Sequence, residues 1–246
     1  MQVDVALTPP SSAPADRTCL VVDVLRATSV IAVLLERGVG RIYPTGSVEA
    51  ARALRAELAA GGEPVFLLGE VGGLPPAGFD AGNSPTALQV EPIGGTRAVM
   101  ATSNGTPALL ACAGAPLVLA TAVVNASAAT RAAIEAGRDV LVVCAGLGGR
   151  EGEDDTLAAG LLVDRLVRAG WETGAVAGEA LRRYDAARED LAGAFRETTH
   201  GKRTLALGFD ADIEYCATPD QIDAVAVLRY EGARPVLERL ERAEPR

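Results

Sequence analysis

Short apolar runs alternate with segments of helical periodicity from residue 18 to residue 146 of the chain. The apolar runs are rich in Val, Leu and Ile, which is typical of strands that are covered on both faces of a sheet. The predicted strands are 18–23, 41–44, 64–70, 96–102, 116–121 and 138–146, and the predicted helices between them are 27–38, 47–62, 105–114 and 125–137. This alternation predicts an α/β fold with three layers, α/β/α, around a mostly parallel or mixed sheet.

The chain after about residue 153 carries mainly helical patterns, which predict a helical C-terminal portion. These patterns cover residues 155–170, 179–195 and about 198–207. No long linker or low-complexity stretch divides the chain, and 246 residues are enough to bury a sizeable core. We therefore expect a single domain over residues 1–246.

The charge of the chain argues against a polyanionic partner. The formal net charge is −9 and the sequence pI is about 4.8, so neither a nucleic acid nor an anionic membrane surface is expected as the main partner. The N-terminus, MQVDVALTPP, lacks the pattern of a signal peptide, and no run of about 18 apolar residues could span a bilayer. We expect a cytoplasmic protein with a small anionic substrate. The sequence leaves the oligomeric state open, and a homo-oligomer is compatible with it.

Five polar clusters lie where predicted strands end. They are residues 23–28, 70–84, 102–106, 123–127 and 146–155. Open α/β sheets bind their ligands beyond the carboxyl ends of the strands. The five clusters are therefore predicted to meet in one site.

Two kinds of chemistry occur in these clusters. Neutral, donor-rich turns and Arg26 suit an anion such as phosphate or sulfonate. Five carboxylates would repel that anion unless a hard cation lay between them: Asp23, Glu70, Asp80, Asp154 and Asp155. Mg²⁺, held by one or two carboxylates and by substrate phosphate oxygens, reconciles the two sets. Each turn taken alone is more simply explained as a helix N-cap, and Asp23 with Arg26 could equally form a structural ion pair.

The segment CAGLGGR, from Cys144 to Arg150, has the Cys-x5-Arg spacing of cysteine-dependent phosphatases. The acidic residues EGEDD follow it directly and would oppose both thiolate formation and the approach of phosphate. A cysteine phosphatase therefore stays as a minor alternative. Leu25 stands where a phosphatase of the haloacid dehalogenase type would need its second Asp, so that pattern fails.

Six motifs of the chain, taken in order, resemble those of the 2-phosphosulfolactate phosphatase (ComB) family. They are VVDVLRATS, GE with GFDAGNSP, TSNGT, NASAA, GEDDTLAAG and THG, and they extend from about residue 20 to residue 205. The resemblance implies a Mg²⁺-dependent phosphatase that hydrolyses 2-phospho-3-sulfolactate to 3-sulfolactate and phosphate, a step in coenzyme M biosynthesis. It also implies a three-layer α/β fold that differs from a standard Rossmann domain.

The residues that match the family motifs are Asp23, Arg26, Thr28, Glu70, Asp80, Asn83, Ser84, Asn104, Gly105, Thr106, Asn125, Asp155 and His200. We interpret Asp23, Arg26 and His200 as catalytic, with Asp23 as nucleophile or as base for a water molecule and His200 as acid for the leaving alkoxide. The predicted Mg²⁺ ligands are Glu70, Asp80 and Asp155. The predicted substrate-binding residues are Arg26, Thr28, Asn83, Ser84, Asn104, Gly105, Thr106 and Asn125.

The chain departs from the family pattern at two positions. Asp154 precedes Asp155 where the family commonly has Glu, and Ser103 stands in place of a second Thr. Both changes preserve the chemistry. Two alternatives stay open, namely a phosphatase for another phosphorylated 2-hydroxy acid and a non-catalytic module that binds anions.

Overall fold

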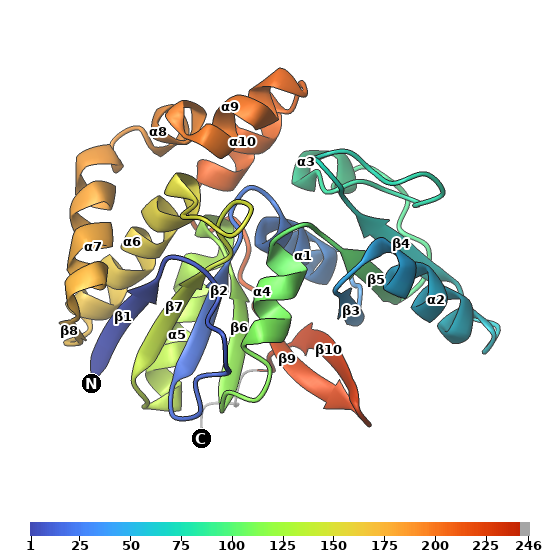
Figure 1. Cartoon of the computed structure of the whole chain (residues 1–246), viewed down its shortest axis with the longest axis horizontal. Helices are drawn as coiled ribbons and strands as arrows, with labels where there is room; N and C mark the ends of the chain where they lie inside the picture. The colour runs from blue at the N-terminus through green and yellow to red at the C-terminus, as the bar shows by residue number, and fades with distance from the viewer. Residues whose placement is uncertain (242–246) are drawn as a thin grey trace.

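The computed structural model describes residues 1–241 and has the α/β architecture that the sequence predicts (Figure 1). The strands are β1 (Gln2–Ala6), β2 (Thr18–Val22), β3 (Arg41–Thr45), β4 (Val65–Gly69), β5 (Arg97–Ala101), β6 (Leu117–Thr121), β7 (Val140–Cys144), β8 (Glu172–Thr173), β9 (Ala226–Glu231) and β10 (Arg234–Arg239). The helices are α1 (Ala27–Glu36), α2 (Val48–Ala59), α3 (Pro85–Leu88), α4 (Gly105–Ala111), the 3-10 turn η1 (Val123–Asn125), α5 (Ala126–Ala136), α6 (Glu153–Arg168), α7 (Ala175–Ala187), α8 (Leu191–Glu197), α9 (Thr199–Ala206) and α10 (Asp210–Ala217).

The predicted strands and helices up to β7 are all present, but the C-terminal portion is helical only as far as α10. After α10 the chain returns to the sheet as the hairpin β9–β10, which the sequence analysis did not predict, as it did not predict β1 and β8. Strand β9 is buried over its first three residues and exposed over the rest. It therefore lacks the continuous apolar run by which the central strands were predicted.

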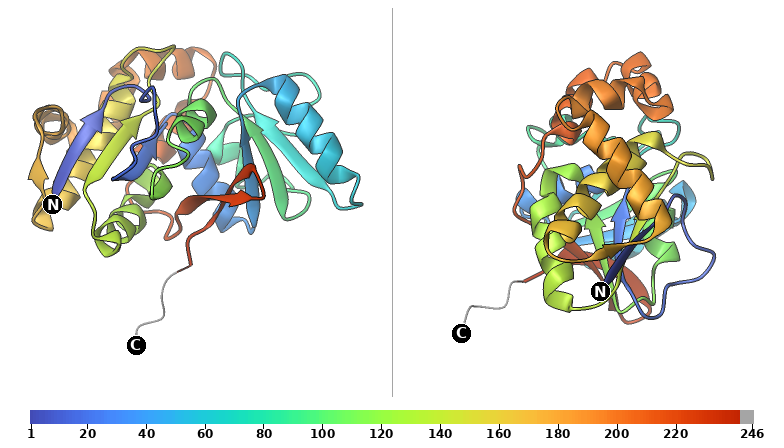
Figure 2. Two further views of the ribbon diagram at one scale, coloured as in Figure 1. Left: turned by 60° about the horizontal axis from the view of Figure 1, so that its bottom comes forward. Right: turned by 90° about the vertical axis from the view of Figure 1, so that its left-hand side faces the viewer.

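The strands form one mixed sheet in the order β4-β5-β3-β10-β9-β6-β2-β7-β1-β8. Strands β3, β4 and β5 are parallel to one another, and so are β1, β2, β6 and β7, but the antiparallel hairpin β9–β10 lies between the two groups. The pairings β3–β10, β10–β9 and β9–β6 are all antiparallel, so the two groups run in formally opposite directions. Residues that follow β2, β4 and β5 nevertheless line one cavity, because the twist of the sheet turns the two groups relative to each other (Figures 1 and 2).

Helices cover both faces of the sheet and form two large hydrophobic cores with it. One core joins α5, α6 and α7 to the sheet, and the other joins α1 and α4 to it. Leu20 and Val22 of β2 belong to the first core, whereas Cys19 and Val21 belong to the second, because successive side chains of a strand point to opposite faces. This two-sided burial explains the continuous apolar runs of the sequence. Among residues 1–241, no helix is long and apolar enough to cross a membrane.

Candidate active site

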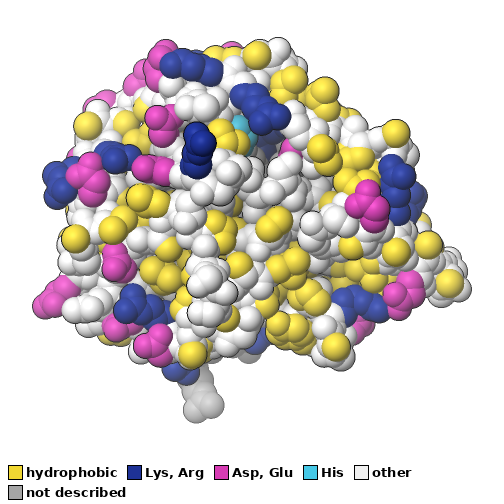
Figure 3. All heavy atoms as spheres, in the orientation of Figure 1, with side chains coloured by type: hydrophobic (Ala, Val, Ile, Leu, Met, Phe, Trp, Pro, Cys, Tyr) yellow, Lys and Arg dark blue, Asp and Glu magenta, His cyan; other side chains and the backbone are white. Residues whose placement is uncertain are grey.

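A cavity lies where the chain leaves β2, β4 and β5 and meets α9. In the space-filling view, the histidine of the chain lies in a hollow with basic side chains at its edge (Figure 3). The cavity is lined by Asp23, Leu25, Arg26, Glu70, Gly72, Gly73, Asn83, Ser103, Asn104, Leu147, His200, Arg203, Thr204 and Leu207. From the predicted site residues, the fold thus brings together Asp23, Arg26, Glu70, Asn83, Asn104 and His200.

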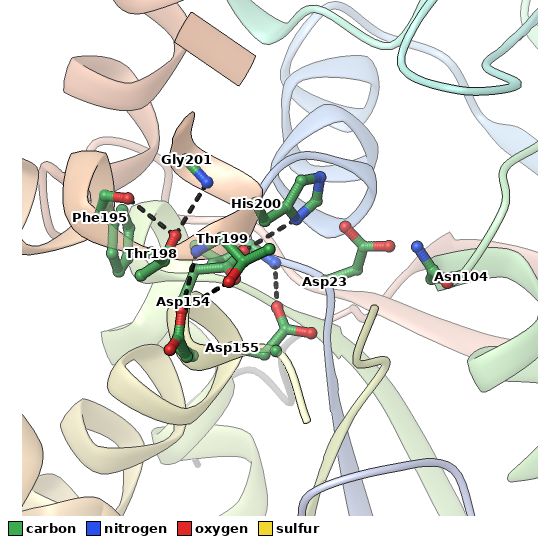
Figure 4. A network of polar contacts seen from close by, with 12 residues as sticks. Asp23, Asn104, Asp154, Asp155, Phe195, Thr198, Thr199, His200 and Gly201 are labelled. Carbon is green, nitrogen blue, oxygen red and sulfur yellow. Dashed lines mark hydrogen bonds and ion pairs between the residues drawn. The ribbon is translucent and has the colours of Figure 1, made fainter. Parts of the chain in front are cut away.

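Helix α9 forms one wall of this cavity. Four residues of the helix and its C-terminal cap line the cavity: His200, Arg203, Thr204 and Leu207. Their spacing of i, i+3, i+4 and i+7 places them on one face of the helix. Thr198 caps the helix, because its hydroxyl accepts a hydrogen bond from Gly201 N (2.9 Å) and donates one to Phe195 O (2.8 Å) (Figure 4). The cap fixes where α9 begins and therefore where His200 points.

His200 is held by a carboxylate from α6. His200 Nδ1 lies 3.1 Å from Oδ2 of Asp154, a buried residue in the first turn of α6. Burial alone lowers the pKa of His200, but the hydrogen bond and the charge of Asp154, together with the charge of Asp23, outweigh burial and raise that pKa above 6.5. Because Nδ1 is engaged, Nε2 is the ring atom that can exchange a proton with a ligand.

Asp23 lies between His200 and Asn104 (Figure 4). Its Oδ1 accepts a hydrogen bond from Ala27 N (3.1 Å), whereas its Oδ2 accepts none from the described part of the chain. Burial raises the pKa of Asp23 from 3.8 to about 6, and the negative charge of Glu70 acts in the same direction. A carboxyl group with this pKa is suited to proton transfer near neutral pH.

The backbone around Asp23 is fixed by neighbours that the sequence analysis also selected. Thr28 Oγ1 accepts a hydrogen bond from Asp23 N (3.1 Å) and donates one to Asp23 O (2.9 Å). A Cβ atom at Gly105 would lie 2.7 Å from Asp23 Oδ2 and 2.5 Å from Ala27 Cβ. Glycine at position 105 therefore gives α4 the room to approach the Asp23 carboxylate.

Arg26 is held from three sides. Its Nη1 forms an ion pair with Asp212 Oδ2 (2.7 Å), its Nη2 donates to Gly73 O (2.9 Å), and its guanidinium carbon lies 4.1 Å from the centre of the Phe209 ring. Asp212 of α10 is fully buried, and its Oδ1 also accepts a hydrogen bond from Ser84 Oγ (2.7 Å). One carboxylate thus links α10, Arg26 and the start of α3.

Glu70 and Asn83 line the cavity from the segment after β4. Glu70 Oε1 accepts a hydrogen bond from Ser103 N (2.7 Å), and Oε2 accepts one from Gly73 N (2.7 Å). Asn83 is buried, and its Oδ1 has no hydrogen-bond partner within residues 1–241. A buried acceptor without a partner is costly, and because Asn83 lines the cavity its Oδ1 is a candidate to bind a ligand there.

The sequence pattern of the 2-phosphosulpholactate phosphatase family matches residues 5–231. The chain belongs to this family. A protein of Thermotoga petrophila is 36% identical over 227 residues, which cover 92% of this chain and 95% of the relative. Proteins of Deinococcus radiodurans (39% over 222 residues, 88% and 89%) and Thermus thermophilus (40% over 215 residues, 85% and 87%) are similar to it as well. Each of the three is named a probable 2-phosphosulfolactate phosphatase.

Membership of the 2-phosphosulpholactate phosphatase family makes the chain a phosphoric monoester hydrolase with a small-molecule substrate. The cavity contains the residue types that phosphate ester hydrolysis uses. It combines a carboxyl group with a raised pKa, a histidine held by a second carboxylate, and a buried guanidinium group. We therefore take this cavity as the candidate active site of the phosphatase.

Asp212→Asn is expected to lower the free energy of unfolding by about 2 kcal/mol and kcat/KM by about tenfold, because Arg26 loses the charge that holds it. Asn keeps the shape of the side chain and an acceptor for Ser84. Denaturant unfolding and phosphate release measure the two effects. Asp210→Asn in the same helix is the matched control, since Asp210 pairs with Arg196 at the surface (2.9 Å) and should change stability by less than about 0.5 kcal/mol. An Asp212→Asn variant as stable and active as the wild type would contradict the anchoring role.

Asp80, one of the predicted Mg²⁺ ligands, lies away from the candidate active site. Its Oδ2 accepts a hydrogen bond from Leu67 N (2.8 Å), and its Oδ1 pairs with Arg55 Nη2 (3.1 Å). It lines a different surface depression together with Arg55. The structure therefore does not bring Asp80 to the cavity, because its position after β4 turns the side chain toward Arg55 of α2.

Asp155, another predicted ligand, is also not a lining residue. Its Oδ1 accepts a hydrogen bond from Val24 N (2.8 Å) and its Oδ2 accepts one from Gly146 N (3.0 Å), so the carboxyl group joins two loops. Burial raises the pKa of Asp155 well above its usual value, and the charge of Asp154 raises it further. Neighbouring residues of a helix point about 100° apart, which is why Asp154 reaches His200 and Asp155 does not.

Several predicted substrate-binding residues have structural contacts instead of lining the cavity: Thr28, Ser84, Gly105, Thr106 and Asn125. Asn125 donates a hydrogen bond to Ala224 O (3.0 Å) and accepts one from Ala122 N (2.8 Å). Thr106 Oγ1 accepts a hydrogen bond from Thr102 N (3.0 Å). These side chains form hydrogen bonds with buried backbone groups. This agrees with the simpler explanation of such turns, in which polar residues cap helices and do not bind a ligand.

Cys144, the nucleophile of the cysteine-phosphatase alternative, is fully buried at the end of β7. Burial raises the pKa of its thiol well above the usual value, and the charge of Asp155 adds to this effect. A catalytic cysteine needs an accessible thiolate. The environment of Cys144 therefore does not support that alternative.

Two charged residues that line or support the site were missed from the sequence, and a third was misjudged. Arg203 lies three residues after His200 on a helical segment, and this spacing could have revealed it. Asp212 is distant from the other motifs in the sequence, so no local signal pointed to it. Asp154 was noted as an acidic residue, but Asp155 was chosen in its place.

Proposed function

We propose that this protein hydrolyses 2-phospho-3-sulfolactate to 3-sulfolactate and inorganic phosphate with the help of Mg²⁺. The observation that carries the proposal is Asp23, a buried carboxyl group with a pKa of about 6 that lies between His200 and Asn104. The substrate carries a phosphate, a carboxylate and a sulfonate, about four negative charges at neutral pH, so it requires cationic donors. The names of the relatives support the same substrate.

The cavity fits a Mg²⁺ ion that the substrate helps to bind. Within residues 1–241, no three His, Cys, Asp or Glu side chains come together as a metal site of their own. Mg²⁺ needs only one or two protein carboxylates when phosphate oxygens and water complete its shell. The Glu70 carboxylate and the unpartnered Oδ1 of Asn83 are the oxygen atoms that would hold it. When bound, the ion neutralises charge on the phosphoryl oxygens.

Asp23 acts on the attacking side of the phosphate ester, and His200 acts on the leaving side. Asp23 Oδ2 either attacks phosphorus or removes a proton from an attacking water molecule, and the bond between phosphorus and the ester oxygen breaks. His200 Nε2 gives its proton to the leaving alkoxide, and the Asp154 carboxylate at Nδ1 favours the protonated ring by raising the pKa of His200. Arg26 donates to the phosphoryl oxygens as charge develops on them.

The two routes for Asp23 differ in whether an aspartyl phosphate forms. In the covalent route, water later hydrolyses this intermediate and restores the carboxylate. Borohydride reduction after brief exposure to substrate converts an aspartyl phosphate into homoserine, which mass spectrometry of the peptide detects. Homoserine at position 23 supports the nucleophile, whereas its absence during full turnover supports the base.

Phosphate release is expected to depend on Mg²⁺. EDTA should lower the rate by at least about 100-fold, and added Mg²⁺ should restore it, because the charge of the bound phosphate would otherwise be only partly neutralised. The assay compares 2-phosphosulfolactate with phospholactate. Equal rates of release from both esters would mean that the enzyme accepts phosphorylated 2-hydroxy acids in general. Phosphate release that continues in EDTA would contradict the role of the metal.

The alternative of a module that binds anions without turnover predicts no phosphate release from either ester under any condition, whereas membership of the family supports the enzyme. For the enzyme, we propose a cytoplasmic role in a route of the coenzyme M type, since the product of the reaction is a sulfonated hydroxy acid.

A further inference from the structure

Arg203 presents an unpaired positive charge at the candidate active site. Its exposed side chain lines the cavity and forms no ion pair or side-chain hydrogen bond with any residue that the structure describes. The adjacent Lys202, by contrast, pairs with Glu197 (3.2 Å). Glu70 lines the same cavity, but both of its oxygens accept hydrogen bonds from backbone N–H groups.

A second guanidinium group approaches the same turn. Arg203 Nη2 lies 3.3 Å from the position that a Cβ atom on Gly72 would take, and Arg26 Nη2 donates to the carbonyl oxygen of the adjacent Gly73 (2.9 Å). Asp212 neutralises Arg26 across 2.7 Å, and no carboxylate does the same for Arg203 within residues 1–241. The turn thus carries two guanidinium groups beside the Glu70 carboxylate, and Arg203 is the one whose donors no described side chain occupies, so it is the group that can bind an anion in this part of the cavity.

We propose that Arg203 binds the sulfonate group of the substrate and makes the enzyme selective for sulfonated phosphate esters. This inference rests on the proposed function, in which His200 protonates the ester oxygen. The carbon that carries this oxygen, and the groups attached to that carbon, must then lie next to His200. Arg203 follows about one helical turn later on the same face of α9, so it lies on the side of the cavity where those groups would be.

The position of Arg203 at the exposed edge of the cavity favours the sulfonate over the carboxylate. The sulfonate stands on an additional methylene group, so it reaches further from the ester oxygen than the carboxylate does. The planar fork of a guanidinium group donates to two oxygens at once, which suits a sulfonate. Arg26 is buried and follows Asp23 by three residues, so it is left for the phosphoryl group.

Arg203→Gln is expected to lower the selectivity of the enzyme by about 10- to 100-fold. Selectivity is measured as kcat/KM for 2-phosphosulfolactate divided by kcat/KM for phospholactate, which lacks the sulfonate. Arg203→Lys keeps the charge without the fork and should give an intermediate ratio. Lys202→Gln is the matched control, since this neighbouring cation pairs with Glu197, is not a lining residue and should leave the ratio within about twofold when replaced.

Two results would overturn the inference. An unchanged ratio with both kcat/KM values unchanged would mean that the sulfonate does not contact Arg203. An unchanged ratio with both kcat/KM values lowered by the same factor would assign Arg203 to the phosphate, to the carboxylate or to folding. Failure of the proposed function is a separate result, namely a wild-type protein that releases no phosphate from either ester. Calorimetric titration with 3-sulfolactate still tests Arg203 in that case: the wild type should bind at least about tenfold more tightly than Arg203→Gln, and equal binding overturns the inference.

Discussion

Asp23→Asn is expected to lower kcat for phosphate release by at least about 10³-fold, a loss typical of removing a nucleophile or an essential base. Asn has nearly the shape of Asp and can still accept the hydrogen bond from Ala27 N, so the fold should be retained. Initial rates at saturating 2-phosphosulfolactate and Mg²⁺ measure the effect. Activity within about tenfold of the wild type would contradict any bond-making role for Asp23.

The same variant should be more stable than the wild type, and the pH dependence has a defined sign. Burial raises the pKa of Asp23 from 3.8 to about 6, so the ionised carboxylate opposes folding. This penalty is absent below about pH 4, grows as the pH rises to about 6, and is constant above that value. At about pH 8, Asp23→Asn should therefore raise the free energy of unfolding by up to about 3 kcal/mol. A stabilised but inactive variant separates a chemical role from a folding defect.

Asp80→Asn is the matched control for Asp23→Asn. Both residues were predicted from motifs of the family, but Asp80 pairs with Arg55 outside the cavity (3.1 Å). Its substitution should change kcat by no more than about twofold. A large loss of kcat at position 80 would place Asp80 among the residues of the active site.

His200→Asn is expected to lower kcat for 2-phosphosulfolactate by about 10²- to 10⁴-fold, because the leaving alkoxide loses its proton donor. The pH profile supplies a second reading. In the wild type, kcat/KM should rise through about pH 6 as Asp23 loses its proton, and it should fall above the pKa of His200, which is raised above 6.5. In the His200→Asn variant, kcat/KM should still rise through about pH 6, but it should no longer fall at higher pH.

An ester that needs no proton donor serves as control for this variant. The leaving group of 4-nitrophenyl phosphate is stable as an anion, so His200→Asn should reduce its hydrolysis by less than about tenfold. If both esters lost activity by the same factor, His200 would act by binding substrate or by shaping the cavity, and its assignment as the acid would fail.

The predicted α/β alternation is confirmed from β2 to β7 because each element carries its own signal. Strand β2 is apolar from Cys19 to Val22 because its side chains are buried on both faces, as Leu20 and Val21 show. The hairpin β9–β10 carries no such run, and its insertion between two parallel groups depends on partners far away in the sequence, such as the pairing of Leu237 with Ile42. Local patterns cannot report contacts of that kind.

The candidate site divides in the same way. Asp23, Arg26, Glu70, Asn83, Asn104 and His200 were selected from the sequence and line one cavity. Asp80 and Asp155 were selected on the same grounds and do not. A carboxylate beside a predicted strand end is equally able to serve a ligand or a backbone N–H group, and only the direction of its side chain separates the two uses.

The sequence by itself determined the family, the class of fold and the segments that supply the active site, because these are written in local periodicity and in ordered motifs. The tertiary structure decided which polar groups meet. It turned two oppositely running groups of strands so that their carboxyl ends line one cavity, and it paired His200 with Asp154 and Arg26 with Asp212. The physical reason is that sheet twist and helix packing set side-chain directions through contacts between residues distant in the sequence, and no local pattern encodes those directions.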